Sequence, residues 1–417
     1  MAKWATRWYA YLAHAILAVT FSGEHRIMHF GEARGQMEAR LITDRKQWND
    51  FVKRTVTGHL CQTYEWAEHG EDAAARTTAL RVGVVEGDAL VGAVLLLRSK
   101  MSGIPGALYY APRGPVVADP AGPVLPILVR GAAKFARQQG GFALRVEPNM
   151  PNDDPRWLAA FKQLGFRATA HIVYLRNTWI LDIRPDEKQL LAEMQTTWRY
   201  NIGKTGRSGV TVRPGGGEAD LDTFYRLEAE TAEREHFYLY PQSVFRDMLA
   251  HYAPEAAARD GTALITLLVA EYQGEPLGAT TVATFGTWAW SMHTGLSSQP
   301  EHRKLRANYL LQWEAIRWAK SHGCEFFDFR NIPEVLEPGQ EMYGVYEFKK
   351  GFGGFFHRVM PTMELPLNPL IYYPFTWALD ARQALRNRRH KTDPAVAVPA
   401  EPTPSNEDRE QVMQAGN

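Results

Sequence analysis

One order of elements occurs twice in this chain, and it restricts the possible folds more than any other feature. In the first copy, two apolar runs flank a Gly-Asp turn, which predicts a β-hairpin, and a strand, a helix and a buried strand follow. We expect these elements at Leu80–Val85, Leu90–Leu97, Ala107–Pro112, Val124–Gln139 and Phe142–Val146. The helix stops at Gly140, a common helix-ending residue.

The second copy follows the same order and also ends its helix at a glycine, Gly323. We expect its elements at Ala263–Tyr272, Pro276–Thr284, Trp288–Thr294, His302–His322 and Glu325–Phe329. Coincidence among common α/β pieces is the alternative explanation. We favour two copies of one unit, each a mixed sheet with a helix packed on it. This order resembles the N-acetyltransferase-like (GNAT) fold, so the predicted class is α/β with two tandem GNAT-like domains.

The expected domain boundaries follow from these copies and from composition. We expect an N-terminal extension at 1–36, the first GNAT-like domain at 37–180, the second at 181–360, an aromatic and basic segment returning to domain one at 361–392, and a disordered tail at 393–417. A start-codon artefact, an interfacial anchor or a signal peptide would each account for the apolar run within 1–36, which is too short to span a membrane.

Composition excludes several classes of protein. Hydrophobic residues make up 45% of the chain and charged residues 22%, which excludes a disordered scaffold, a collagen-like fibre and a polytopic membrane protein. The net charge is +1, so attraction to nucleic acid or lipid must come from local patches. Cys61 and Cys324 are the two cysteines and lie far apart, which argues against a disulfide framework or a metal site and favours a reducing, cytoplasmic location.

The turn before each central helix bears on the acyl donor. Coenzyme A users of the GNAT fold hold the donor pyrophosphate on a glycine-rich turn at this point. In the second copy, Arg306 and Asn308 stand at the two glycine positions. In the first copy, Asp119 and two prolines precede the helix, and proline has no N–H to donate. We therefore expect neither coenzyme A nor any other cofactor.

Four ordered segments resemble the signature segments of the Fem family. They are Tyr110–Val116, Trp198–Ile202, Asn308–Ala319 leading to Gly323 and Asp328, and Phe348–Gly354. The resemblance runs from about Met37 to Leu365, and the absence of a long charged heptad stretch matches the compact form without a coiled-coil insertion.

The Fem family consists of non-ribosomal peptidyltransferases that build peptidoglycan cross-bridges. The resemblance implies an aminoacyltransferase whose donor is aminoacyl-tRNA and whose acceptor is an amine of the stem peptide, on lipid II or on a UDP-linked muropeptide. A peripheral position at the inner face of the membrane, for which the aromatic and basic stretch after Leu370 is the argument, would suit a lipid-linked acceptor. The alternatives are an acyl-CoA-dependent N-acyltransferase acting on an envelope polymer and a non-catalytic protein that binds RNA or a membrane surface.

The implied chemistry needs a positive charge and a base. Attack of an amine on an ester passes through an oxyanion, and Lys349 aligns with the family's motif lysine, although Lys349 and Lys350 would also suit a solvated pair. Glu147 and Asp328 end equivalent strands of the two copies. Either carboxylate could orient or deprotonate the amine, or could close a strand end by pairing with an arginine.

Other residues are expected to bind substrate. Arg113 would hold an acceptor phosphate or carboxylate, or brace its Pro-Arg-Gly-Pro turn. A cluster of basic residues would contact tRNA or the acceptor diphosphate, or form a solvated helix face; it comprises Arg199, Lys204, Arg207 and Arg213. We also expect Tyr240, Trp290 and Phe348 to contact substrate.

Two positions depart from the family's pattern. Glu68-His69 stands where a lysine commonly reaches the acceptor's phosphates, and Tyr240 stands where we expect an arginine. The acceptor diphosphate must therefore be held differently, or the acceptor is not the usual precursor. Further on, the aromatic stretch Leu370–Ala378 leads into basic residues from Arg382 onward, which indicates an interfacial helix or a helix packed on domain one.

Overall fold

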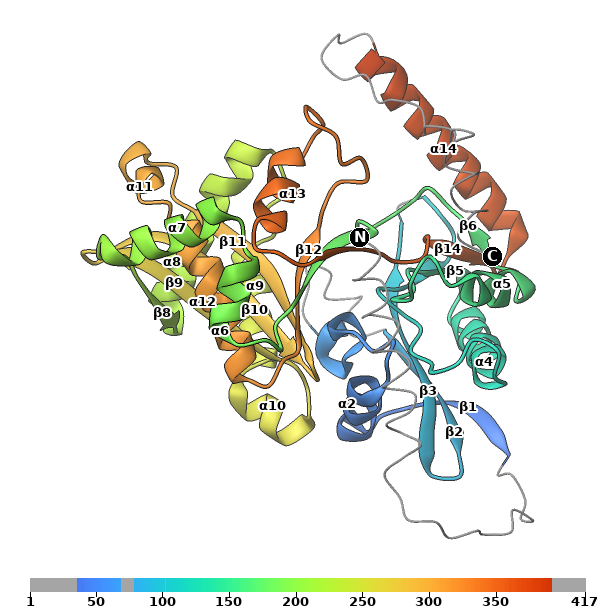
Figure 1. Cartoon of the computed structure of the whole chain (residues 1–417). Helices are drawn as coiled ribbons and strands as arrows, with labels where there is room; N and C mark the ends of the chain where they lie inside the picture. The colour runs from blue at the N-terminus through green and yellow to red at the C-terminus, as the bar shows by residue number, and fades with distance from the viewer. Residues whose placement is uncertain (1–35, 69–78, 102, 392–417) are drawn as a thin grey trace, which may run out of the picture. The chain divides into compact units, whose positions relative to one another are not determined.

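The computed structural model describes residues 36–68, 79–101 and 103–391. Residues 1–35 of the predicted extension, His69 and the predicted tail at 393–417 lie outside the described residues. Two seven-stranded sheets form the framework, in the strand orders β1-β2-β3-β4-β5-β14-β6 and β13-β7-β12-β11-β10-β9-β8 (Figure 1). Each sheet contains one of the two predicted copies.

The first sheet is completed by a strand from late in the sequence. Its members are β1 (Met37–Leu41), β2 (Leu80–Glu86), β3 (Ala89–Ser99), β4 (Ala107–Ala111), β5 (Gly141–Val146), β6 (Arg167–Ala168) and β14 (Met363–Pro366), with helices α2 (Arg45–Arg54), α4 (Val124–Gln138) and α5 (Pro155–Gln163). Met363 of β14 pairs with Val146 on one side and with Ala168 on the other. Residues 363–366 therefore belong to the sheet of the first domain.

The second sheet comprises β7 (Asn177–Asp182), β8 (Thr211–Gly215), β9 (Leu264–Tyr272), β10 (Glu275–Phe285), β11 (Trp288–Leu296), β12 (Phe326–Asn331) and β13 (Phe355–Arg358). Its helices are α6 (Glu187–Glu193), α7 (Thr196–Arg207), α8 (Gly217–Glu235), α9 (Gln242–His251), α10 (Pro254–Asp260), α11 (Pro300–Lys304), α12 (Ala307–Ser321) and α13 (Tyr343–Lys350). Strand β7 pairs with β12 and β13 and runs across the boundary predicted at 180/181.

The helix predicted at His302–His322 is divided in two. Helix α11 ends at Lys304 and α12 begins at Ala307. Arg306 between them has φ 53°, in the left-handed region, so a right-handed helix cannot run through it. The prediction of one continuous helix was therefore wrong at this point. The turn keeps a backbone conformation that glycine favours, although an arginine occupies it.

Strand β9 shows how the second sheet separates two cores. Its alternate residues Ile265, Leu267 and Val269 belong to one hydrophobic cluster, and Leu268 and Ala270 belong to another. Successive side chains of a strand point to opposite faces of the sheet. Helix α8 packs on the first of these faces through residues such as Phe224, and α12 packs on the second through residues such as Leu311.

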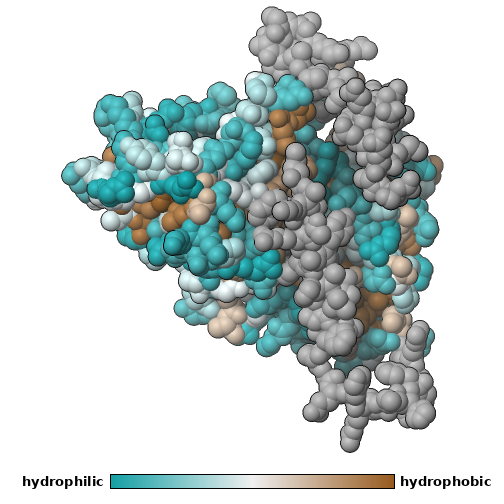
Figure 2. Space-filling model, viewed as in Figure 1, coloured by the Kyte–Doolittle hydropathy of each residue, from teal (hydrophilic) through white to brown (hydrophobic). Residues whose placement is uncertain are grey.

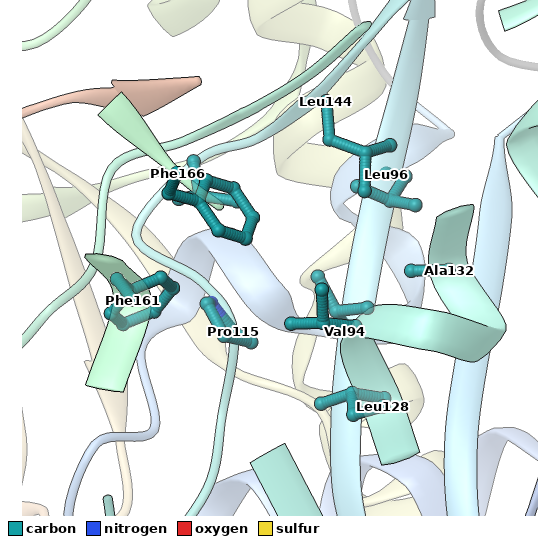
Figure 3. A pocket seen from close by; sticks show the side chains of 10 residues that line it. Val94, Leu96, Pro115, Leu128, Ala132, Leu144, Phe161 and Phe166 are labelled. Atoms are coloured by element: carbon teal, nitrogen blue, oxygen red, sulfur yellow. The ribbon is translucent and has the colours of Figure 1, made fainter. Parts of the chain in front are cut away.

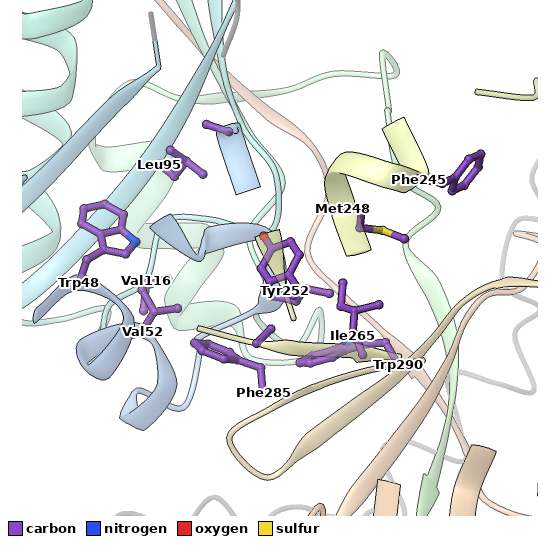
Figure 4. Packing of buried hydrophobic residues seen from close by; sticks show 14 of the residues in the cluster. Trp48, Val52, Leu95, Val116, Phe245, Met248, Tyr252, Ile265, Phe285 and Trp290 are labelled. Carbon is purple, nitrogen blue, oxygen red and sulfur yellow. The ribbon is translucent and has the colours of Figure 1, made fainter. Parts of the chain in front are cut away.

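The cluster on the α8 face is shared with the first domain. Trp48 and Val52 of α2 lie in the same cluster as Tyr252, Phe285 and Trp290 (Figure 4). Three hydrogen bonds accompany this packing: between the hydroxyls of Thr63 and Tyr252 at 2.8 Å, from Thr262 to Glu65 at 2.8 Å, and from Asn49 to the carbonyl of Asp260 at 3.1 Å. Apolar burial and buried polar contacts together join the two domains.

A small pocket lies inside the first domain (Figure 3). Its lining is entirely apolar and includes Val94, Leu128, Leu144, Phe161 and Phe166. The pocket therefore offers no group for acyl-transfer chemistry.

Among the described residues, 368–391 belong to a separate compact unit that contains helix α14 (Pro369–Lys391). Leu370 and Trp377 of this helix are 87% and 75% exposed. Within the described residues, no helix combines the length and the apolar character needed to cross a membrane. Over the rest of the visible face, hydrophilic side chains predominate and apolar ones gather in small patches (Figure 2).

Candidate functional site

The second sheet opens where β11 and β12 part. These strands pair in parallel at only three positions, and the last of them joins Trp290 to Asp328. Beyond it, β12 continues beside β7, with Asn331 opposite Thr178, while β11 continues beside β10. Asp328 therefore stands at the point of divergence, which is where the GNAT fold is expected to hold an acyl donor.

Asp328 is buried and held by two donors. The Thr178 hydroxyl and the main-chain N–H of Arg330, the latter at 2.5 Å, both donate to Oδ1. Burial raises the pKa of Asp328, while these hydrogen bonds and the charges of Arg113 and Arg330 oppose the rise. Both of these donors reach the same oxygen, Oδ1.

Lys349 lies beside Asp328, in the last turn of α13. Its Nζ donates to the main-chain carbonyls of Asn331 at 2.7 Å and Arg330 at 3.3 Å, at the end of β12. Burial lowers the pKa of Lys349 to about 7, with Arg330 adding to the effect and Asp328 opposing it. The half-buried Lys349 side chain can therefore change between its ammonium and its neutral amine form near neutral pH.

The neighbouring residues hold Lys349 in place. Lys350 points elsewhere and pairs with Glu347 on its own helix at 3.2 Å. Phe348 packs in the α12-side core, and its carbonyl accepts a hydrogen bond from Trp198 at 3.0 Å. A Cβ on Gly351 would lie only 2.1 Å from the Trp198 ring, so the motif needs glycine there for close packing.

Glu147 is engaged on both oxygens and is not free to act as a base. It accepts from the Tyr110 hydroxyl at 2.5 Å, from the N–H of Val173 at 2.7 Å, from the Tyr174 N–H at 3.3 Å and from the Thr362 hydroxyl at 3.1 Å. The expected arginine partner is replaced by these four donors. Glu147 thus fixes the chain at 173–174, just before the second domain begins.

Arg113 reaches the same connecting segment. It has φ 54°, and its Nη2 donates to the carbonyl of Leu175 at 2.9 Å. Its guanidinium carbon lies 5.5 Å from the centre of the Tyr174 ring. The sequence-predicted Arg113, Glu147, Asp328 and Lys349 are therefore linked through this segment and through β12.

Arg199, Lys204 and Arg207 are brought together only loosely. Arg199 donates to the carbonyls of Leu191, Ala192 and Met194 at 2.8–3.1 Å and so caps the end of α6. Lys204 and Arg207 are exposed on α7. Only these last two are placed to meet a phosphate backbone.

Arg213, Tyr240 and Trp290 have different settings. Arg213 is committed to Asp220 and Glu271, and these bonds raise the pKa of Arg213. Tyr240 is 44% exposed and can meet a ligand. Trp290 is buried in the shared core, and its ring centre lies 4.9 Å from that of His59. Its role here is to pack against His59, because so little of its surface is exposed to a ligand.

Sequence reasoning missed four residues of this site: Tyr174, Thr178, Arg330 and His59. Arg330 could have been found, because it follows Asp328 by two positions in the same strand. Tyr174 stands in a connecting segment without a motif. At the departures from the family's pattern, Glu68 pairs with Arg45 at 2.6 Å.

The FemAB family matches residues 43–154, 159–259 and 262–379, which is most of the chain. The protein belongs to the FemAB family. The resemblance predicted from the four sequence segments is thereby confirmed.

Relatives and solved structures agree with this assignment. The chain is 24% identical over 400 residues to the lipid II:glycine glycyltransferase of Staphylococcus saprophyticus, covering 81% of this chain and 94% of the relative. It is 23% identical over 408 residues to the enzyme of that name from Staphylococcus aureus strain MRSA252, with the same coverage. The crystal structure of FemX matches with a TM-score of 0.71 and 21% identity, covering 80% of this chain and 98% of FemX. The predicted fold of two tandem GNAT-like domains is confirmed.

Proposed function

We propose that this protein is an aminoacyltransferase of peptidoglycan cross-bridge synthesis. It moves an amino acid from aminoacyl-tRNA to an amine of the stem peptide on a lipid-linked precursor, working at the cytoplasmic face of the membrane. The observation that carries the proposal is that Lys349 Nζ binds the carbonyls of Arg330 and Asn331, just after Asp328 on β12, where β11 and β12 part. Membership of the FemAB family and relatives named lipid II:glycine glycyltransferase support it.

The two groups suit the two demands of the reaction. The amine nitrogen attacks the ester carbonyl carbon, the C–N bond forms, and the C–O bond to the tRNA ribose breaks. Asp328 takes the proton that the amine loses, and that proton leaves on the ribose oxygen. Lys349 in its ammonium form donates to the oxyanion of the tetrahedral intermediate. Burial raises the pKa of Asp328, which makes it a better base than an exposed aspartate.

A pool of charged tRNA with a lipid-linked precursor tests the proposal. Mass analysis of the precursor should show one added amino-acid residue, and omission of tRNA should abolish it. A matched reaction with a UDP-linked muropeptide distinguishes the two forms of acceptor. Addition of an acyl group from acyl-coenzyme A without tRNA would instead support the alternative N-acyltransferase, and an unchanged precursor in every arm would refute an enzymatic role of this kind.

A further inference from the structure

Two arginines from different domains converge on one tyrosine ring. The guanidinium carbon of Arg113 lies 5.5 Å from the centre of the Tyr174 ring, and that of Arg330 lies 5.8 Å from it. The two carbons are therefore no more than about 11 Å apart. All three side chains are partly exposed, so a ligand can reach them.

Neither guanidinium is matched by an acidic side chain. In the described part of the chain, no carboxylate forms an ion pair with Arg113 or with Arg330, whereas arginines such as Arg145 and Arg213 do pair. Arg113 donates to one carbonyl, and Arg330 makes only long contacts to Met292, at 3.5 Å to its carbonyl and 3.4 Å to its sulfur. A guanidinium has five N–H donors, so most donors of both groups remain available.

Both arginines have a strained, left-handed backbone conformation. Arg113 has φ 54° and Arg330 has φ 58°, conformations that residues with side chains rarely adopt. Such strain persists where the surrounding structure enforces it, and it gathers at ligand sites. Here Glu147 holds the Tyr174 main chain, and Asp328 holds the Arg330 main chain. The carboxylates thus position the ring and one of the arginines.

The charges of both arginines act on buried groups around them. They add to the burial that lowers the pKa of His59, and they oppose the burial that raises the pKa of Cys61. The same two charges oppose the burial that raises the pKa of Asp328, so the arginines and this carboxyl share one electrostatic environment.

We propose that Arg113 and Arg330 form a clamp for one oxyanionic group of the acceptor substrate, a phosphate or a carboxylate. The Tyr174 ring, which lies against both guanidinium groups, would hold them in place. An anion there accepts charge-assisted hydrogen bonds from both guanidinium groups. That the ligand belongs to the acceptor rests on the function proposed above; the clamp itself rests on the geometry. Arg330 is then a specificity-determining residue, beside Lys349 and Asp328 and distinct from both in role.

Calorimetric titration of the full chain with inorganic pyrophosphate and, separately, with N-acetylglutamate tests the clamp. Arg113→Gly and Arg330→Gly relieve the strained φ while removing the charge, so the fold should persist and circular dichroism checks it. We expect each to weaken binding of the preferred anion at least tenfold, and Arg330→Lys to lose less. Gln273→Gly is the control for the backbone change, since Gln273 has φ 51° and is exposed in the turn between β9 and β10, and it should change binding less than twofold.

The preferred probe identifies the source of the anion: pyrophosphate indicates the carrier diphosphate, and N-acetylglutamate indicates a carboxylate of the stem peptide. Absence of binding to the wild-type chain, or equal losses in Gln273→Gly and Arg330→Gly, would overturn the clamp. Anion binding that depends on Arg113 and Arg330 without transfer in the charged-tRNA assay would leave the clamp standing and refute the proposed function alone.

Discussion

Replacement of Lys349 by methionine separates catalysis from structure most directly. The variant keeps much of the apolar stem and removes the group that donates to the carbonyls of Asn331 and Arg330. Loss of one preorganised donor to an oxyanion typically costs ~10²–10³ in rate. The single-turnover rate of transfer should therefore be at least a hundredfold lower in Lys349→Met than in the wild-type protein.

Lys350→Met is the internal control for this experiment. Lys350 pairs with Glu347 three residues earlier on the same helix, and both side chains are more than a third exposed. Such pairs contribute about 0–1 kcal/mol, so we expect less than an approximately fivefold loss of rate. Equal small effects of both substitutions would reduce the segment to a structural turn.

The pH dependence of the transfer rate supplies a second comparison of the wild-type protein with Lys349→Met. With a pKa of about 7, about nine-tenths of Lys349 is protonated at pH 6 and about one-tenth at pH 8. If the ammonium form is active, the ratio of wild-type to Lys349→Met rates should fall as pH rises through 7. Taking the ratio cancels the ionisation of the acceptor amine. A ratio that increases with pH would mean that the neutral amine is the active form, and our assignment would be wrong.

Stability gives an independent check of the same pKa. The pKa of Lys349 is lower in the folded chain than in the unfolded chain, so between about pH 7 and 10.5 the unfolded chain binds more protons. Wild-type stability should therefore increase with pH across that window relative to Lys349→Met. Denaturant midpoints at pH 7 and pH 9 measure this difference. An unchanged difference would show that Lys349 is not desolvated in solution.

Three further predictions follow from the fold. Acetyl-coenzyme A should show no binding by calorimetry, and micromolar binding competitive with charged tRNA would contradict the proposed donor. If Lys204 and Arg207 touch tRNA phosphates, each alanine substitution should lower the slope of log affinity against log salt by about 0.7–0.9, whereas Arg199→Ala should lower the melting temperature because it uncaps α6. Glu147→Gln should cost about 1–3 kcal/mol of stability, since an amide meets donors with a donor, and a hundredfold rate loss without destabilisation would restore Glu147 as a base.

The sequence allowed prediction of the repeated elements because their signals are local. Apolar runs around Gly87 and Gly274 mark the hairpins, and both glycines have positive φ as such turns require. The break before α12 could not be predicted in this way, since Leu305 and Tyr309 continue the apolar stripe across it. The placement of β14 was equally inaccessible, because its pairing with β5 joins residues more than 200 positions apart.

The sequence allowed prediction of those candidate site residues that lie at strand ends or in a motif. Asp328 and Lys349 were predicted from spacing and resemblance, and in the structure Lys349 Nζ binds the carbonyls of Arg330 and Asn331, which follow Asp328 on β12. Glu147 was identified as a strand-end carboxylate, but its partners come from a connecting segment and from Thr362, so no local pattern could reveal its role. Tyr174 was not predicted either, because it lies in the same connecting segment, which has no recognisable motif.

The connecting segment makes the two domains interdependent at the site. Glu147 of the first domain fixes the main chain of Val173 and Tyr174, and Arg113 of the first domain binds the next carbonyl, that of Leu175. Two residues later β7 begins and supplies Thr178, which holds Asp328. A change at Glu147 can thus reach Asp328 through five consecutive residues, 174–178. The geometry of the candidate site therefore depends on contacts from both domains.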